Sequence, residues 1–448
     1  MVNVDVLNLE WSSFPSRDRI ASTLVANYLR YQGVSVYEGD IFKGYQLIRK
    51  LKPKLLFING SVGAKINHHI VKYAHSLGIK VVSFSAEGNY TENHPLGIDP
   101  FFWGWNKEKI LFEDYALVWS RRVKDLIINR HKNLDKKIMI CGGIGFDQFK
   151  IQPLANKSEF LSQYSKSKYK KVIGVGCWNF GGFYKDSPQY ENKRRKLSIE
   201  QIKRFRDDAH GFNKILKKAI EEYPDILYII KEHPGRTEGA RASAIEGLDK
   251  YPNVLCIHSE ESIKTCIEIS DFWLFYESTT SLEAWLLDKM TFKLNPTGED
   301  FIRNDVHKGS PLIQTFKQLN NLIVSFYSNQ QIEIFDTLLS ERKELVKSII
   351  NSSDGLNHVR AGNVIIEFLH KKSKAEIKSM SYKFQKRDEF INRIAYFFRD
   401  IINSKNKLKP FDRKELEQYT GSQYRNQIAY YNHLEFDKIE LLSIKSNL

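Results

Sequence analysis

The sequence predicts an α/β protein made of two successive parallel β-sheets and a helical C-terminal region. Short apolar runs alternate with helical stretches in residues 1–152, and the same alternation begins again in residues 153–330. Strands separated by helices are typical of βαβ units, whose strands are parallel. At 448 residues the chain is long enough for two or three domains with separate cores. Residues 331–448 make the third region, whose helices are expected to return to the body.

The first alternation covers the N-terminal domain. Strands are expected at residues 4–9, 34–37, 54–58, 79–84, 115–119 and 137–140. Helices are expected at residues 17–32 and 68–77, each followed by a glycine, Gly33 or Gly78, as its stop. This order indicates one parallel sheet.

The second alternation follows a polar stretch, residues 152–170, which is expected to be a linker. Strands are expected at residues 172–176, 226–230, 254–257, 272–276 and 290–294. Helices are expected at residues 199–223, from Ser262 onward, at 282–288 and over 313–370. This part of the chain therefore indicates a second parallel sheet, of similar size to the first.

The chain carries a formal charge of +15, which favours anionic partners such as nucleic acid, phospholipid or sugar nucleotides. Residues 371–448 hold 17 Lys and Arg against 10 Asp and Glu, a net of +7, so about half of the excess lies in this tail. No basic motif with interleaved aromatic residues is present, and a nucleic acid is therefore not the expected partner.

The sequence lacks several localisation signals. The N-terminus has no basic start followed by an apolar run, and no stretch reaches the roughly 18 uninterrupted apolar residues of a membrane span. Its four cysteines lack metal-ligand spacing, which favours reduced thiols and a cytoplasmic location.

The segment Lys231-Glu232-His233-Pro234 follows directly on the expected strand 226–230. Ligands of parallel α/β sheets bind at the carboxyl ends of strands. Pro234 restricts the backbone, and His233 beside Lys231 can donate hydrogen bonds to a phosphate and stabilise the charge of a departing nucleotide. The alternative is a turn whose histidine bonds a nearby carbonyl group.

Three consecutive hydroxyl residues, Ser278, Thr279 and Thr280, lie between strand 272–276 and helix 282–288. Hydroxyls and exposed N–H groups at a helix start suit phosphate binding. Glu283, in the first turn, is a candidate for holding ribose hydroxyls. Capping of the helix by Ser281, and a favourable interaction of Glu283 with the helix dipole, are the structural alternatives.

The series of Lys-x-His-Pro, Ser270-Asp271, Ser-Thr-Thr-Ser-Leu-Glu-Ala and Leu-Asn-Pro resembles the donor-binding half of GT-B glycosyltransferases that build bacterial surface polysaccharides. It is similar to polysialyltransferases, capsule Kdo transferases and CDP-glycerol glycerophosphotransferases. The resemblance covers residues 220–300 well and the N-terminal half loosely. It implies two Rossmann-like domains facing across a cleft, with a cytidine nucleotide's phosphate bound by the His-Pro and Ser/Thr motifs without a metal.

The same families carry an acidic residue beside a glycine as general base, and the matching position here is Glu87 with Gly88. The chain has Ala86 where polysialyltransferases have a second acid. The alternative is that Glu87 only precedes a turn at Gly88, with Glu92 and His94 as reserve candidates for the base.

Three further interpretations concern glycines and acids elsewhere in the sequence. Gly181 and Gly182 are candidates for the floor of the cleft near the phosphate. Asp147, after the last strand of the first half, is interpreted as a structural hydrogen-bonding residue. No Asp-x-Asp pair follows a strand in the first half, which argues against a metal-dependent GT-A enzyme.

The sequence therefore predicts a metal-independent, inverting glycosyltransferase without a cofactor, acting in capsule or lipopolysaccharide biosynthesis. A CMP-sugar is slightly favoured as donor, with a glycan or a lipid-linked molecule as acceptor. Alternatives are a CDP-glycerol or ribitol phosphotransferase, an isomerase resembling UDP-N-acetylglucosamine 2-epimerase, and a basic nucleic-acid-binding protein.

A helical segment near the C-terminus places several large apolar residues on one face: Phe390, Ile394, Phe397, Phe398 and Ile401. Such a face more often packs in the protein core, and contact with an anionic membrane is the alternative, which the charge of the basic tail supports. A peripheral position on the inner face of the plasma membrane therefore stays open beside a cytoplasmic one.

Overall fold

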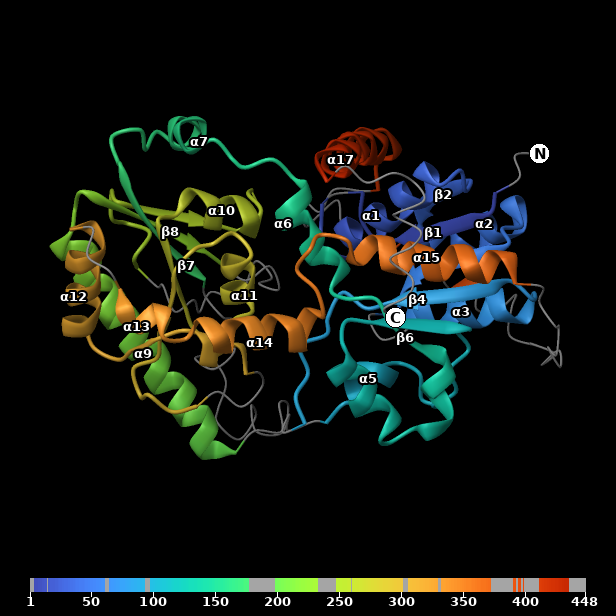
Figure 1. The fold of residues 1–448 in the computed structure, drawn as a ribbon, viewed down its shortest axis with the longest axis horizontal. Coiled ribbons are helices and arrows are strands. Elements are labelled where there is room, and N and C mark those ends of the chain that lie inside the picture. The colour runs from blue at the N-terminus through green and yellow to red at the C-terminus, as the bar shows by residue number, and fades with distance from the viewer. Residues whose placement is uncertain are drawn as a thin grey trace. The chain divides into compact units, whose positions relative to one another are not determined.

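The computed structural model divides the chain into two compact units. Unit 1 comprises residues 1–92, 97–152 and 347–448, and unit 2 comprises residues 93–96 and 153–346. The structure describes residues 4–13, 15–60, 64–92, 97–176, 198–232, 247–258, 260–300, 305–328, 332–371 and 411–434, with single helical positions at 390, 391, 394, 395 and 398. Figure 1 labels the elements of both units.

Unit 1 is built on a six-stranded sheet in the order β2-β1-β3-β4-β5-β6. All of its pairs are parallel. The strands are β1 (Val6–Glu10), β2 (Val36–Asp40), β3 (Leu55–Asn59), β4 (Lys80–Phe84), β5 (Tyr115–Val118) and β6 (Ile138–Ile140). Their interiors are nearly all buried, because helices cover both faces of the sheet.

Capping residues and apolar faces explain why the first helices of unit 1 form where they do. Ser16 caps α1 (Arg17–Tyr31) by accepting a hydrogen bond from the Arg19 N–H. The other helical elements before residue 153 are η1 (Ile41–Lys43), α2 (Gly44–Leu51), α3 (Lys65–Ser76), α4 (Asp99–Trp103), α5 (Arg121–Ile128), η2 (Lys132–Lys137), η3 (Ile144–Asp147) and α6 (Gln148–Ile151).

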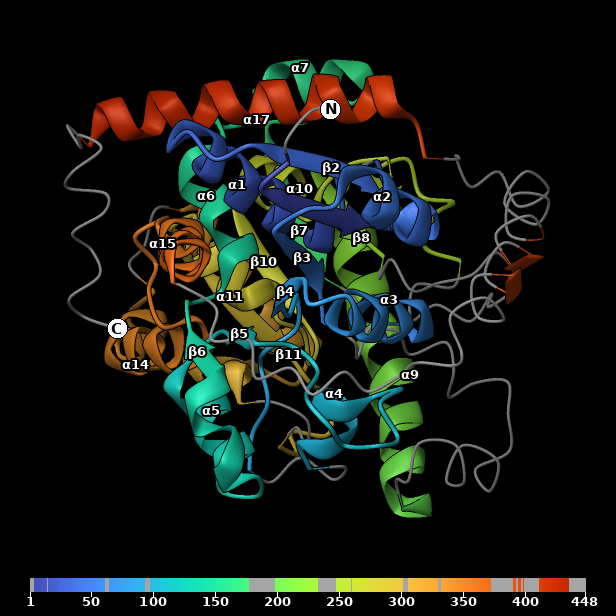
Figure 2. The same cartoon turned by 90° about the vertical axis from the view of Figure 1, so that its right-hand side faces the viewer.

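Two C-terminal helices, α15 (Asn357–His370) and α17 (Arg413–His433), complete unit 1. Ala361, Val364 and Ile365 of α15 share one apolar cluster with residues of α1. The long helix α17 runs beside α1, as Figure 2 shows. The C-terminal region thus supplies part of the core of the N-terminal sheet.

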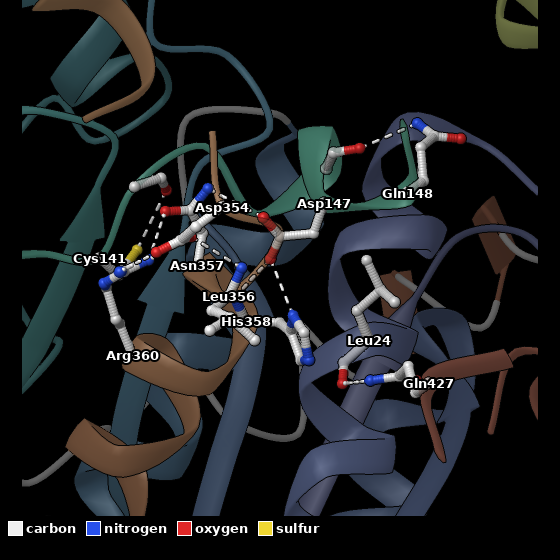
Figure 3. Close-up of polar contacts among 12 residues, drawn as sticks. Leu24, Cys141, Asp147, Gln148, Asp354, Leu356, Asn357, His358, Arg360 and Gln427 are labelled. Atoms are coloured by element: carbon white, nitrogen blue, oxygen red, sulfur yellow. Dashed lines mark hydrogen bonds and ion pairs between the residues drawn. The ribbon is translucent and has the colours of Figure 1, made fainter. Parts of the chain in front are cut away.

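A buried polar network holds these helices in place (Figure 3). The carboxylate of Asp147 accepts hydrogen bonds from the Asn357 amide at 2.9 Å and from the His358 backbone N–H at 2.7 Å. Its Oδ2 also lies 2.8 Å from His358 Nδ1, and His358 Nε2 lies 2.5 Å from the Tyr431 hydroxyl. These side chains are almost fully buried. Asp147 therefore links η3, α15 and α17, the structural role expected from the sequence.

Unit 2 is built on a second parallel sheet in the order β12-β11-β10-β7-β8-β9. Its strands are β7 (Lys171–Gly176), β8 (Ile226–Lys231), β9 (Val254–Ile257), β10 (Phe272–Phe275), β11 (Thr291–Leu294) and β12 (Leu312–Ile313). The helical elements are α7 (Lys157–Gln163), α9 (Ile199–Glu222), α10 (Ile263–Ile269), α11 (Thr280–Trp285), η5 (Val306–Gly309), α12 (Phe316–Tyr327), α13 (Glu333–Asp336) and α14 (Leu339–Ile350), whose residues from Lys347 onward belong to unit 1. Apolar clusters lie on both faces of this sheet.

Two local expectations for unit 2 were wrong. The polar stretch 152–170 contains α7, which Asn156 caps by accepting from two backbone N–H groups and which buries Phe160 and Leu161. Helix α11 begins at Thr280, two residues before the expected start. The segment 313–370 is helical as expected, but it consists of four helices.

Among the residues that the structure describes, no helix is both long enough and apolar enough to cross a membrane.

Candidate functional site

The sheet of unit 2 brings the two predicted phosphate-binding loops to one edge. Strand β7 lies between β8 and β10, with Gly176 level with Lys231 on one side and with Phe275 on the other. The loops after β8 and β10 therefore start about 10 Å apart, two strand spacings, at the same carboxyl edge. His233, Pro234, Gly181 and Gly182 lie outside the described residues, so their roles stay predictions.

Lys231 is held by the protein itself. Its side chain is 9% exposed. Its ammonium donates to the carbonyl group of His258 and, at 3.5 Å, to that of Glu232. Burial lowers the pKa of this lysine. In this arrangement Lys231 connects the ends of β8 and β9, and its predicted contact with phosphate would require the side chain to turn away from His258.

A second pair at this edge was not predicted. The Nδ1 atom of His258, just after β9, lies 2.7 Å from Glu232 Oε2. The imidazole is half exposed, whereas the carboxylate is buried. The sequence signal was only a histidine at a strand end, which is too common to single out.

The hydroxyl cluster at the start of α11 is partly engaged. Thr280 Oγ1 accepts from the Trp273 indole N–H at 3.0 Å, and Ser278 Oγ accepts from the Thr280 backbone N–H at 3.3 Å. The N-cap residue is Thr279, whose side chain makes no capping bond, so the alternative in which Ser281 caps the helix does not hold. Ser281 is buried and donates to the Ser278 carbonyl at 3.2 Å.

Close packing at the end of β7 explains how this loop is seated. A Cβ atom at Gly176 would lie 2.6 Å from Thr280 Oγ1, so only glycine lets the loop lie on the strand end. Ser278, Thr279 and Thr280 all stay partly exposed there. Glu283 is 4% exposed, and its predicted contact with ribose would need its surroundings to open.

Unit 1 contains a cavity of about 290 Å³ at the carboxyl ends of its strands. Glu87 lies on its wall with a side chain that is 70% exposed, and its Oε1 is 2.8 Å from Arg17 Nη1. The turn after it depends on Gly88, because a Cβ there would lie 2.2 Å from the Trp119 ring. Glu87 therefore fits both a base at the cavity and the start of a tight turn.

Asp18, which the sequence reasoning missed, lines the same cavity. Burial raises the pKa of Asp18, Arg17 opposes that shift, the charge of Glu87 adds to it, and a hydrogen bond with Asn59 opposes it again. In the sequence Asp18 looks like an ordinary acid in the first turn of a helix. Of the reserve candidates, Glu92 is exposed and does not line the cavity, and His94 lies outside the described residues.

A third carboxyl, Glu10 at the end of β1, is buried and interacts electrostatically with Asp18. Burial raises the pKa of Glu10 to about 8, with a further increase from Asp18 and an opposing effect of Arg19. Three acids thus gather at the carboxyl edge of the unit 1 sheet, a grouping that suits proton transfer. Among the described residues, no three His, Cys, Asp or Glu side chains are grouped so that they could hold a metal ion.

Glu10→Gln should change the pH dependence of stability. The folded state keeps the Glu10 proton up to a pKa of about 8, whereas an unperturbed glutamate releases it near 4.5, so wild-type stability falls as pH rises through this range. Because one pKa unit corresponds to about 1.4 kcal/mol, the variant should match the wild type near pH 5 and exceed it by roughly 2–4 kcal/mol near pH 9.

Denaturant unfolding at pH 5, 7 and 9 measures this difference. Glu92→Gln, at an exposed position, controls for the loss of one negative charge. Parallel pH curves for the wild type and Glu10→Gln would contradict the assignment of a buried, protonated Glu10.

Comparison with known proteins shows similarity in fold. No protein family model matches the sequence, and no curated protein matches it. S. aureus MnaA, solved with UDP, is 12% identical and has a TM-score of 0.52, covering 82% of this chain and 97% of its own. A UDP-N-acetylglucosamine 2-epimerase is 14% identical with a TM-score of 0.52 over 83% of this chain and 98% of its own. The wall teichoic acid polymerase TagF, soaked with CDPG, is 11% identical with a TM-score of 0.51 over 81% and 88%. These similarities and the two six-stranded parallel sheets show that the chain has a GT-B fold with a helical C-terminal region.

Proposed function

We propose that this protein is a glycosyltransferase that moves a sugar from a nucleotide donor to a hydroxyl group of an acceptor. The observation that carries the proposal is the order β10-β7-β8, which brings the His-Pro loop and the hydroxyl loop to one edge of unit 2. Proteins of the same fold have been solved with UDP and with CDPG, which supports a nucleotide-activated donor. The motifs favour a CMP-sugar, a glycan or lipid-linked acceptor and a role in bacterial surface polysaccharide synthesis.

The proposed reaction inverts the configuration of the transferred sugar and needs no metal. A base takes the proton of the acceptor hydroxyl, the acceptor oxygen bonds to the anomeric carbon, and the bond from that carbon to the donor phosphate breaks. The nucleotide leaves with the bonding electrons. His233, Ser278 and Thr279 stabilise the charge that develops on the departing phosphate.

Two carboxyls of the unit 1 cavity are candidates for the base. The family resemblance points to Glu87, and burial points to Asp18, because a desolvated carboxylate is a stronger base. The proposal therefore gives the proton transfer to the pair. Both side chains contact Arg17 electrostatically, which places them in one charged group.

Attachment to an anionic membrane surface is part of the proposal. Phe390, Ile394 and Phe398 occupy helical positions one turn apart, with 63%, 41% and 55% of their surfaces exposed. The basic residues of 371–448 lie on either side of them in the sequence. Phe397 and Ile401 lie outside the described residues.

A second candidate function is isomerisation of a nucleotide sugar, which the fold shared with a UDP-N-acetylglucosamine 2-epimerase favours. Incubation with single nucleotide sugars and no acceptor separates the two functions. The transferase should leave the sugar configuration unchanged, whereas an epimerised product would refute it in favour of the isomerase. The third candidate function is transfer of glycerol phosphate from a CDP donor. Incubation with CDP-glycerol and an acceptor would reveal it by the appearance of a glycerol phosphate product.

Nucleotide binding should depend on His233. A thermal-shift panel of CMP, CDP, UDP and GDP should give its largest rise with a cytidine nucleotide, since ligands of the folded state raise its melting temperature. His233→Ala should lower that affinity at least 10-fold, because it removes a phosphate contact. His433→Ala, at an exposed histidine at the end of α17 in unit 1, is the control. An equal shift in the wild type and His233→Ala would exclude the proposed role.

Turnover should depend on the carboxyl pair without affecting nucleotide binding. Asp18→Asn and Glu87→Gln should each lower kcat at least 100-fold, the usual contribution of a general base, while the nucleotide shift stays at the wild-type size. In Glu87→Gln, loss of the neighbouring negative charge should lower the pKa of Asp18 and move the acid limb of the residual rate profile to lower pH. Wild-type turnover in both variants would rule out the pair.

A further inference from the structure

The cavity of unit 1 has a polar end and an apolar end. The polar end lies at α1, β3 and β4 and is formed by Asp18, Asn59, Ser85 and Glu87. The apolar end lies between β5 and the helices α4 and α5, where the lining side chains include Phe101, Phe102, Ala116, Val118, Val123 and Ile127. A ligand in this cavity would therefore meet carboxylates at one end and only hydrocarbon along most of the rest.

Strand β5 supplies Ala116, Leu117 and Val118 to the cavity wall. Leu111 and Glu113 line it before the strand begins, and Trp119 lines it after the strand ends. Glu113 is a buried carboxyl within this otherwise mainly apolar part of the wall.

The lining of the cavity is mostly apolar. Apolar surface that faces water is unfavourable by roughly 25 cal/mol per Å², so a ligand that covers this wall gains affinity. The surrounding residues, among them Ile98, Val118 and Ile127, belong to one buried apolar cluster. Water gains little there, because it needs polar partners. The shape therefore indicates a ligand with an apolar part.

We infer that this cavity binds the acceptor through an aliphatic chain, with the reacting hydroxyl held at the Asp18 and Glu87 end. The acceptor class is then an amphiphilic alcohol rather than a purely polar glycan, and this identification of the ligand as acceptor depends on the proposed transfer. An aliphatic chain next to a sugar hydroxyl meets both ends of the cavity.

Two matched probes test the inference without any donor. Octyl glucoside and methyl glucoside carry the same sugar hydroxyls and differ only in the chain. Calorimetric titration of the whole protein, below the concentration at which octyl glucoside forms micelles, should show octyl glucoside binding at least 100-fold more tightly. Each buried methylene adds to affinity, so a chain of seven further carbons supplies this ratio even when only part of it is buried. A negative heat-capacity change should accompany the binding.

Cavity variants locate the binding. Ala116→Leu fills the apolar end, and Leu111→Trp narrows it from a partly exposed position that tolerates a larger side chain. Both should lose at least 10-fold in octyl glucoside affinity. Ile110→Trp adds the same bulk at an exposed neighbour that does not line the cavity and should bind like the wild type. Unfolding temperature and the nucleotide shift show whether each variant is folded.

The outcomes separate this inference from the proposed function. Equal affinity for the two glucosides, or octyl glucoside binding that survives both cavity variants, would overturn the cavity assignment even if nucleotides bind as expected. Selective octyl binding without any nucleotide response would support the cavity assignment and contradict the proposed transfer.

Discussion

Pairing of parallel strands on both sides of β7 is the constraint on which the candidate site of unit 2 depends. Parallel neighbours require a crossover between them, so every strand of the sheet ends at the same edge. The loop after β8 and the loop after β10 belong to crossovers far apart in the sequence. They start at one edge because Gly176 is level with both Lys231 and Phe275. The pairing alone therefore brings Lys231 and the hydroxyl residues Ser278, Thr279 and Thr280 to one edge of the sheet.

Buried polar groups fix how the C-terminal helices join unit 1. The carboxylate of Glu38, which is 2% exposed, is within 3.3 Å of Arg19 and 2.8 Å of Arg30, and it also accepts from Thr420 of α17. A buried charge is tolerated only with such partners, since removal from water costs several kcal/mol. Asp147 satisfies the same requirement through hydrogen bonds from Asn357 and His358 of α15 (Figure 3). The contacts of these two carboxylates hold α17 in one position on unit 1.

The chemistry proposed for unit 1 follows from unequal burial of neighbouring acids. Glu87 reaches solvent and pairs with Arg17, whereas Asp18 and Glu10 are desolvated and hold their protons to higher pH. Acids that titrate over different ranges can divide the tasks of binding a hydroxyl group and accepting its proton. The cavity wall beside them is mostly apolar, which is the feature on which the proposed binding of an aliphatic chain depends.

The sequence by itself determined the fold class and most of the elements. Strand 254–257 was predicted at its observed bounds, and the predicted helix 17–32 ends one residue beyond the observed end of α1. The alternation of strands and helices correctly predicted two parallel sheets. These predictions succeeded because apolar periodicity and helix stops are local signals. The predicted start of α11 was wrong, and α7 was not predicted at all. Short helices depend on capping and packing as much as on their own residues.

Only the tertiary structure decided which side chains of the candidate site meet. Asp18, Glu87 and Glu10 come from three separate segments, and only the fold leaves Glu87 exposed while it buries Glu10 and Asp18. The engagement of Lys231 with His258 and of Thr280 with Trp273 likewise arises between elements. Desolvation and side-chain contacts are properties of the folded surroundings, so residue type and spacing could name the candidates but not their environments.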